Sequence, residues 1–130
     1  MLILTLRTDK PEAEIGLYND TAQLSYQSWQ AHRQLAETIH LKIKEVLDAQ
    51  DLSLKDVEGI AMHQGSGSFT GLRIGITVAN ALADSLGIPI CGKIGDDWIE
   101  PTIRRLLNNE SDKLIIPEYG SLPNITAPRK

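Results

Sequence analysis

The residues whose types and spacing most suggest a binding site lie between Gly65 and Gly75, in the run Gly-Ser-Gly-Ser-Phe-Thr-Gly-Leu-Arg-Ile-Gly. Glycines permit a tight turn, and free backbone N–H groups at the start of a following helix can meet an anion. A phosphate-binding loop needs a lysine before Ser or Thr, and none follows here. A dinucleotide fingerprint has the pattern Gly-x-Gly-x-x-Gly, but here three residues, Ser68, Phe69 and Thr70, separate Gly67 from Gly71. The pattern therefore favours a structural turn over a phosphate site.

The other chemically capable side chains form no recognisable constellation. His32, His40 and His63 have no Cys or acidic neighbours at metal-ligand spacing. Ser68 lacks the Gly-x-Ser-x-Gly elbow of a nucleophile and is instead a helix cap candidate. The lone cysteine, Cys91, excludes a disulfide within the chain and a cysteine-based zinc site. We therefore predict no catalytic residue, no cofactor and no metal.

Small residues recur every fourth position in the helix that is predicted to follow the loop, namely Gly71, Gly75, Ala79 and Ala83. A glycine inside a helix costs about 1 kcal/mol relative to alanine, so two on one stripe indicate that another backbone approaches closely. That backbone can belong to the chain's own sheet or to a partner subunit. Arg73 in the first helical turn faces an unfavourable dipole and needs an anionic partner, within the domain or across an interface. The sequence leaves both alternatives open.

Size and charge narrow the class of protein. A chain of 130 residues with 42% hydrophobic and 23% charged residues has the size and composition of one globular domain. The net charge of −4 and the lack of a basic cluster argue against direct tRNA or duplex binding. The first ten residues do not resemble a signal peptide, and no apolar run is long enough to cross a membrane. We expect a cytoplasmic protein without a membrane partner.

The periodicity of apolar residues predicts strands and helices that would position the loop. Strands are predicted at residues 1–6, 14–18, 23–26, 57–62, 88–91 and 114–116. Helices are predicted at about 31–49, 68–86 and 98–107. Strands followed by alternating helix and strand indicate one α/β domain with a mixed sheet and two main packing helices. We expect a single lobe over residues 1–116 and an extended tail over 117–130.

Three stretches together resemble the TsaB (YeaZ) family: residues 53–61, the loop at 65–75 and the Leu-Gly-Ile-Pro-Ile run at 86–90. The family motif Gly-x-Gly-Ser-Phe-Thr-Gly-x-Arg-x-Gly is carried here by Gly65, Gly67, Ser68, Phe69, Thr70, Gly71 and Arg73. The resemblance covers roughly residues 1–95. It implies one lobe of the two-lobed actin/Hsp70-like, ribonuclease H-like fold.

The resemblance also implies a non-catalytic subunit for the synthesis of threonylcarbamoyladenosine in tRNA. Such a subunit pairs with the catalytic TsaD, with TsaE as the ATPase, and meets tRNA only through the complex. In the family the subunit contact uses the two helices of the first lobe, and a homodimer through the same helices is an alternative. The implied interface residues are Leu35, Ile39, Ile43, Phe69, Gly71, Leu72, Gly75, Ala79 and Ala83.

Departures from the family pattern bear on nucleotide chemistry. Arg7 stands where the family usually has an Asp, and its positive charge is unsuited to hold Mg²⁺. Ser66 replaces the usual proline. Actin-like folds bind nucleotide between two lobes, and we expect only one lobe here. The competing hypothesis is a small-ligand or nucleotide-binding enzyme domain that uses the loop from Gly65 to Gly71.

Overall fold

The computed structural model describes residues 1–67 and 69–117, without the side chains of His32 and Phe69. Five strands form one sheet in the order β3-β2-β1-β4-β5. The strands are β1 (Leu2–Arg7), β2 (Glu12–Asn19), β3 (Ala22–Gln30), β4 (Gly59–His63) and β5 (Ile90–Lys93). β1 pairs antiparallel with β2, β2 antiparallel with β3, β1 parallel with β4, and β4 parallel with β5. The sheet is therefore mixed, with β1 at its centre.

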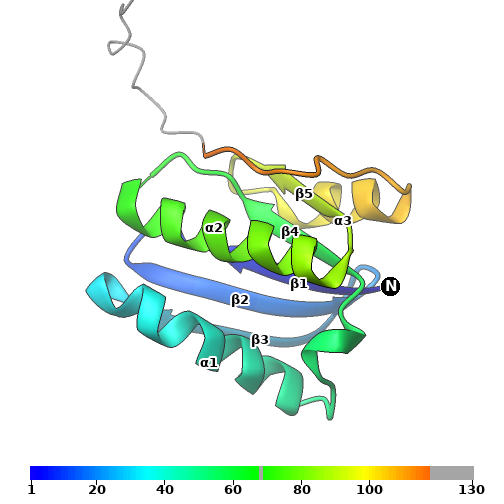
Figure 1. Ribbon diagram of the computed structural model, residues 1–130, viewed down its shortest axis with the longest axis horizontal. Coiled ribbons are helices and arrows are strands. Elements are labelled where there is room, and N and C mark those ends of the chain that lie inside the picture. The colour runs from blue at the N-terminus through cyan, green and yellow to red at the C-terminus, as the bar shows by residue number, and fades with distance from the viewer. Residues whose placement is uncertain (68, 118–130) are drawn as a thin grey trace, which may run out of the picture.

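Helices cover both faces of this sheet, and α1 and α2 lie side by side on one of them (Figure 1). The helical elements are η1 (His32–Gln34), α1 (Leu35–Asp48), η2 (Leu54–Asp56), α2 (Phe69–Leu86) and α3 (Ile99–Leu107). Leu4 and Leu6 of β1 pack with α1 and α2, whereas Ile3 packs with α3. This division follows from the strand repeat of two residues, which sends alternate side chains to opposite faces. Within the described residues, no helix is long and apolar enough to cross a bilayer.

The predicted elements agree with the structure except near the end of the chain. The five strands and three helices that the periodicity predicts before residue 108 are all present, with shifted ends. The predicted strand at 114–116 is wrong, because this segment pairs with none of the strands in the described part of the chain. Its middle residue, Ile115, is instead held by Asn80 of α2: the Ile115 N–H donates to Asn80 Oδ1 at 2.8 Å, and Asn80 Nδ2 donates to the Ile115 carbonyl at 3.0 Å.

The segment from Glu110 to Ile116 runs beside β5 and takes the place of a sixth strand (Figure 1). The Asp112 N–H donates to the Ile90 carbonyl at 2.7 Å, and the Gly92 N–H donates to the Asp112 carboxylate at 2.9 Å. Arg105 of α3 also bonds Asp112, with 2.5 Å between Nη2 and Oδ1. The hydrogen bonds from Arg105 and from the Gly92 N–H lower the pKa of the Asp112 carboxyl, and together with the backbone bond to Ile90 they fix the segment to the sheet. The predicted tail at 117–130 lies outside the described residues, except for Pro117.

Candidate functional site

A polar hollow of about 530 Å³ opens at the carboxyl ends of β1, β4 and β5. We call it the strand-end crevice. It is lined by Arg7, Asp9, His63, Gly65, Ser66, Ile94, Gly95 and Asp96. Open α/β sheets bind ligands at this position, outside the carboxyl ends of strands where neighbouring connections diverge. The crevice is therefore the main candidate for a ligand-binding or catalytic site.

A nearly buried ion pair occupies the crevice. Arg7 Nε donates to Asp9 Oδ1 at 2.8 Å and Arg7 Nη2 to Asp9 Oδ2 at 3.3 Å, and the two side chains are 14% and 7% exposed. Burial opposes ionisation of Asp9, but the hydrogen bonds and charge of Arg7 outweigh it and hold the pKa of Asp9 below its ordinary value. Arg7 Nη2 also reaches Asp96 at 3.3 Å. The guanidinium is thus engaged by two carboxylates of the chain.

His63 at the end of β4 is a structural residue in this arrangement. The Gly65 N–H donates to its Nδ1 at 3.2 Å, and its Nε2 lies 3.0 Å from the Gly95 carbonyl. Because a carbonyl only accepts, Nε2 carries the proton and Nδ1 is the acceptor. Burial lowers the pKa of His63, and its ring meets Trp98 edge-on, with centroids 5.4 Å apart. Both ring nitrogens are used, which leaves neither for proton transfer to a substrate.

The glycines of the predicted loop allow close packing onto the residues that follow β1. A Cβ on Gly67 would overlap the Asp9 carbonyl, and a Cβ on Gly75 would overlap the Thr8 hydroxyl. The loop and the start of α2 therefore press directly on the end of β1. This geometry accounts for the glycine spacing without a phosphate, as the structural interpretation of the loop predicts.

The small-residue stripe of α2 also packs inside the chain. Gly75, Ala79 and Ala83 are buried, whereas Gly71 is half-buried. The close approach that their spacing indicates is therefore made to the chain's own sheet, at Thr8. This observation decides between the two alternatives in favour of intramolecular packing for Gly75.

Most of the predicted interface residues belong to the core. Six of them are at most 4% exposed: Leu35, Ile39, Ile43, Leu72, Ala79 and Ala83. These side chains pack within the chain in this conformation, and a partner contact through them stays a prediction. The side chain of Phe69 lies outside the described residues, as does Ser68 with its predicted cap. Of the other motif residues, Gly65 is buried, while Gly67, Thr70 and Arg73 are exposed.

Asp9 is the site residue that sequence reasoning missed. The comparison with the family pattern pointed to Arg7 alone, whose charge suggested a lost metal ligand. The available signal was the pair of opposite charges two residues apart at the end of a strand, where both side chains can lie on the same side. Arg7 and Asp9 satisfy each other in this way.

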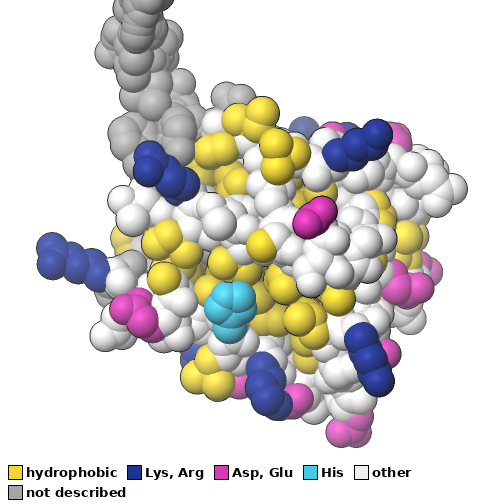
Figure 2. Space-filling view, viewed as in Figure 1, with side chains coloured by type: hydrophobic (Ala, Val, Ile, Leu, Met, Phe, Trp, Pro, Cys, Tyr) yellow, Lys and Arg dark blue, Asp and Glu magenta, His cyan; other side chains and the backbone are white. Residues whose placement is uncertain are grey.

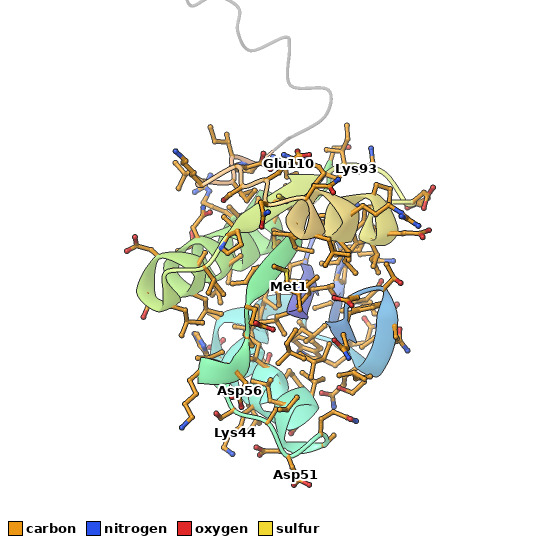
Figure 3. The ribbon with its side chains drawn as sticks, turned by 90° about the vertical axis from the view of Figure 1, so that its right-hand side faces the viewer. Met1, Lys44, Asp51, Asp56, Lys93 and Glu110 are labelled. Atoms are coloured by element: carbon orange, nitrogen blue, oxygen red, sulfur yellow. The ribbon has the colours of Figure 1, made fainter. Side chains whose placement is uncertain are left out.

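A second hollow, of about 340 Å³, lies between α1, α2 and the connection that contains η2. We call it the helix groove. It is lined by His40, Ile43, Lys44, Leu47, Asp48, Leu52, Ser53, Leu54 and Leu82. Figure 2 shows hydrophobic side chains gathered over the middle of this face and charged side chains toward its margin. In Figure 3, Lys44, Asp51 and Asp56 mark the end of α1 and the connection after it, at the opposite side of the molecule from Glu110.

The strand order and the two-sided helical cover define a ribonuclease H-like, actin-like fold. A RuvC structure from Thermus thermophilus shares the fold, with a TM-score of 0.52 and 12% identity. YeaZ from Pseudomonas aeruginosa is more similar: its structure superimposes with a TM-score of 0.66 at 28% identity, over 72% of this chain and 43% of that one. The sequence model described as "TsaD: tRNA N6-adenosine threonylcarbamoyltransferase" matches residues 29–92. These matches make the chain similar to the TsaB/YeaZ family over about 70% of its length.

Two curated relatives are matched by this chain over only part of their length. The tRNA threonylcarbamoyladenosine biosynthesis protein TsaB of Escherichia coli is 32% identical over 97 residues, which span 71% of this chain and 39% of that protein. The tRNA N6-adenosine threonylcarbamoyltransferase of Geotalea uraniireducens is 48% identical over 62 residues, which span 48% of this chain and 18% of that protein. The chain therefore spans less than half the length of these relatives.

Proposed function

We propose that the chain acts in the biosynthesis of threonylcarbamoyladenosine in tRNA, as a non-catalytic subunit that pairs with a TsaD-like protein. Its relatives named TsaB and its match to the TsaD sequence model support the pathway. The observation that carries the proposal is the helix groove, an apolar hollow on the one sheet face where two helices lie side by side. In this proposal residues 1–116 form the working lobe, since Ile115 still belongs to its core at 2% exposure.

The contents of the strand-end crevice support a role without catalysis. Arg7 and Asp9 hydrogen-bond each other, and both nitrogens of His63 face backbone groups. A general base needs a free lone pair within reach of a substrate proton, and a nucleophile needs such a base beside it. Arg7, Asp9 and His63 are instead engaged by groups of the chain itself. Nucleotide binding by the loop from Gly65 to Gly71 is the competing function.

The partner contact is assigned to the outer surfaces of α1 and α2 rather than to their buried stripes. Leu41 is 54% exposed on α1, and Leu82 of α2 and Leu52 line the helix groove. Apolar anchors of this kind, ringed by polar residues, are the usual centre of a protein interface. Lys44 and Asp48 at the groove supply charges of both signs for its rim. The same surface offers a homodimer as an alternative to the TsaD-like partner.

Copurification tests the pathway and the partner together. The purified chain is mixed with the TsaD-like protein of the same cell, and the mass of the complex is measured in solution, with and without a TsaE-like ATPase. A one-to-one complex supports the proposal. A stable homodimer that excludes the TsaD-like protein contradicts the heterotypic contact, and micromolar binding of labelled ATP or ADP by the isolated chain contradicts the scaffold role.

Two matched leucine substitutions test the surface. Leu41→Glu places a charge on α1, and Leu114→Glu places one at a similarly exposed leucine outside the α1 and α2 helices; the two side chains are 54% and 62% exposed. We expect Leu41→Glu to weaken the complex by roughly tenfold or more. Leu114→Glu should leave it unchanged. Equal affinities for the two variants would remove α1 from the interface.

A further inference from the structure

The strand-end crevice holds a cation in the geometry that recognises oxyanions. Arg7 extends from the end of β1 into a hollow of about 530 Å³ with 14% of its side chain exposed. A planar guanidinium presents two parallel N–H groups that match the oxygens of a carboxylate or a phosphate. Here Nε and Nη2 both point at the carboxylate of Asp9. The anion that this arginine binds is therefore part of the chain itself.

We propose that Asp9 is a built-in anion that keeps the strand-end crevice closed to phosphate, and that removal of its carboxylate converts the crevice into a site for inorganic phosphate or sulfate. The inference concerns a specificity-determining residue. It goes beyond the proposed scaffold function and does not depend on any partner.

The surroundings of Asp9 hold its carboxylate in place. Gly67 of the loop packs against the Asp9 carbonyl so closely that no larger residue fits. On another side, His63 Nδ1 lies 3.8 Å from Asp9 Oδ2. The Asp9 backbone is packed against the loop, and both carboxylate oxygens accept hydrogen bonds from Arg7, so an incoming anion must displace these two bonds to reach the guanidinium.

The charge balance of the crevice also opposes an external anion. The described lining contains one positive group, Arg7, and two negative groups, Asp9 and Asp96. Burial lowers the pKa of His63, so it contributes no positive charge at neutral pH. Asp96 is 97% exposed, so water and salt screen it far more than they screen Asp9 at 7%. Asp9 is thus the carboxylate whose removal changes the balance most.

The test compares Asp9→Ala with the unchanged chain in a phosphate titration. Thermal unfolding is followed at constant ionic strength, with sodium chloride replacing phosphate in the reference series. We expect saturable stabilisation of Asp9→Ala, by about 3–6 °C at tenfold excess over its dissociation constant. The unchanged chain should show no difference between the two salts. Sulfate should act like phosphate on the variant.

Two further variants isolate the cause. Asp97→Ala removes a neighbouring carboxylate that does not line the crevice, and it should gain no phosphate response. The double variant Arg7→Gln with Asp9→Ala lacks the cation, and it should lose the response that Asp9→Ala gained. A phosphate response in Asp97→Ala or in the double variant overturns the assignment to Arg7.

A direct readout on the unchanged chain keeps the proposal testable if Asp9→Ala does not fold. The Arg7 Nε–H resonance should stay constant through the phosphate titration, because Asp9 occupies that donor. A saturable shift of this resonance overturns the proposal, as does a folded Asp9→Ala or Asp9→Ser variant without a phosphate response. None of these outcomes bears on copurification with a TsaD-like protein, so the two proposals fail separately.

Discussion

The strand-end crevice and the helix groove differ in the kind of groups that line them. In the strand-end crevice, Arg7, Asp9 and His63 are bonded to other parts of the chain. In the helix groove, aliphatic carbons of Leu47, Leu52 and Leu82 line a hollow that nothing in the described part of the chain fills. A set of satisfied polar groups gives little reason for further association, whereas uncovered apolar surface does. The larger hollow is therefore the weaker candidate for a partner.

The largest expected loss of stability comes from disrupting the contact between α2 and the end of β1. Gly75→Val puts a branched side chain where even a Cβ would overlap Thr8. Overpacking of this kind costs about 3 kcal/mol, because helix and strand must move apart. Urea unfolding measures the loss, with Thr77→Val on the exposed side of the same helix as control. If Gly75→Val has normal stability but fails to pair with a partner, the small-residue stripe is part of the interface rather than of the core.

The next largest loss of stability tests whether the negative charge of Asp9 stabilises the crevice. Asp9→Asn should lower the free energy of unfolding by about 2 kcal/mol at neutral pH, because it leaves the Arg7 cation without its buried partner. The pKa of Asp9 is lower in the folded state, so its carboxylate stabilises the fold above the unfolded pKa of about 4. That contribution is lost as the pH falls through the folded pKa.

Urea unfolding from pH 7 to pH 2 measures this dependence. The difference in stability between the unchanged chain and Asp9→Asn should stay constant above about pH 5 and shrink below about pH 4. A difference that does not change with pH would mean that Asp9 acts through packing rather than through its charge. Asp97→Asn, outside the crevice, is the matched control and should change stability by less than about 0.5 kcal/mol.

A smaller effect is expected at the segment beside β5. Asp112→Ala removes the acceptor of the Gly92 N–H and the partner of Arg105. We expect a loss of about 1 kcal/mol, because this pair is about one third exposed and solvent screens it. In the Asp112→Ala variant, amide hydrogen exchange should accelerate more in β5 than in β1, each compared with the unchanged chain. Equal protection in both strands would show that the segment adds nothing to the sheet edge.

The smallest effect on folding should come from the outer surface of α1. Leu41→Glu changes an exposed leucine on α1, so the free energy of unfolding should change by less than about 0.5 kcal/mol. Pairing with a TsaD-like protein should nevertheless weaken, and this separation of folding from binding distinguishes a surface anchor from a core residue. A large loss of stability would place Leu41 in the core and remove it from the comparison.

Sequence periodicity predicted the strands and helices because each depends on local patterning. The apolar run of β1 and the helical spacing in α1 and α2 are readable from neighbouring residues alone. The charged pair at Arg7 and Asp9 was not predictable in this way. Asp9 follows a strand, where polar residues are ordinary, and it is buried only because the Gly67 loop from a distant part of the chain closes over it.

The wrong prediction of a strand at residues 114–116 and the burial of the predicted interface residues also have tertiary causes. The apolar run at residues 114–116 is typical of a strand, but the backbone partners of Ile115 come from the Asn80 amide. The predicted interface residues on α1 and α2 follow the apolar stripe, which identifies the buried side of a helix and says nothing about its outer side. Surface residues such as Leu41 become visible as candidates only after the core is known.

The fixed segment beside β5 makes the two edges of the sheet unequal. An edge strand with bare N–H and C=O groups is a template onto which another chain can add a strand. At β5 those groups meet the backbone and side chains of Ser111 and Asp112. The opposite edge, β3, has a row of exposed side chains and, among the described residues, no strand beyond it. Fibrous or edge-to-edge assembly of this chain, where it occurs, should therefore begin at β3, and a chain cut before Glu110 should acquire a second starting point.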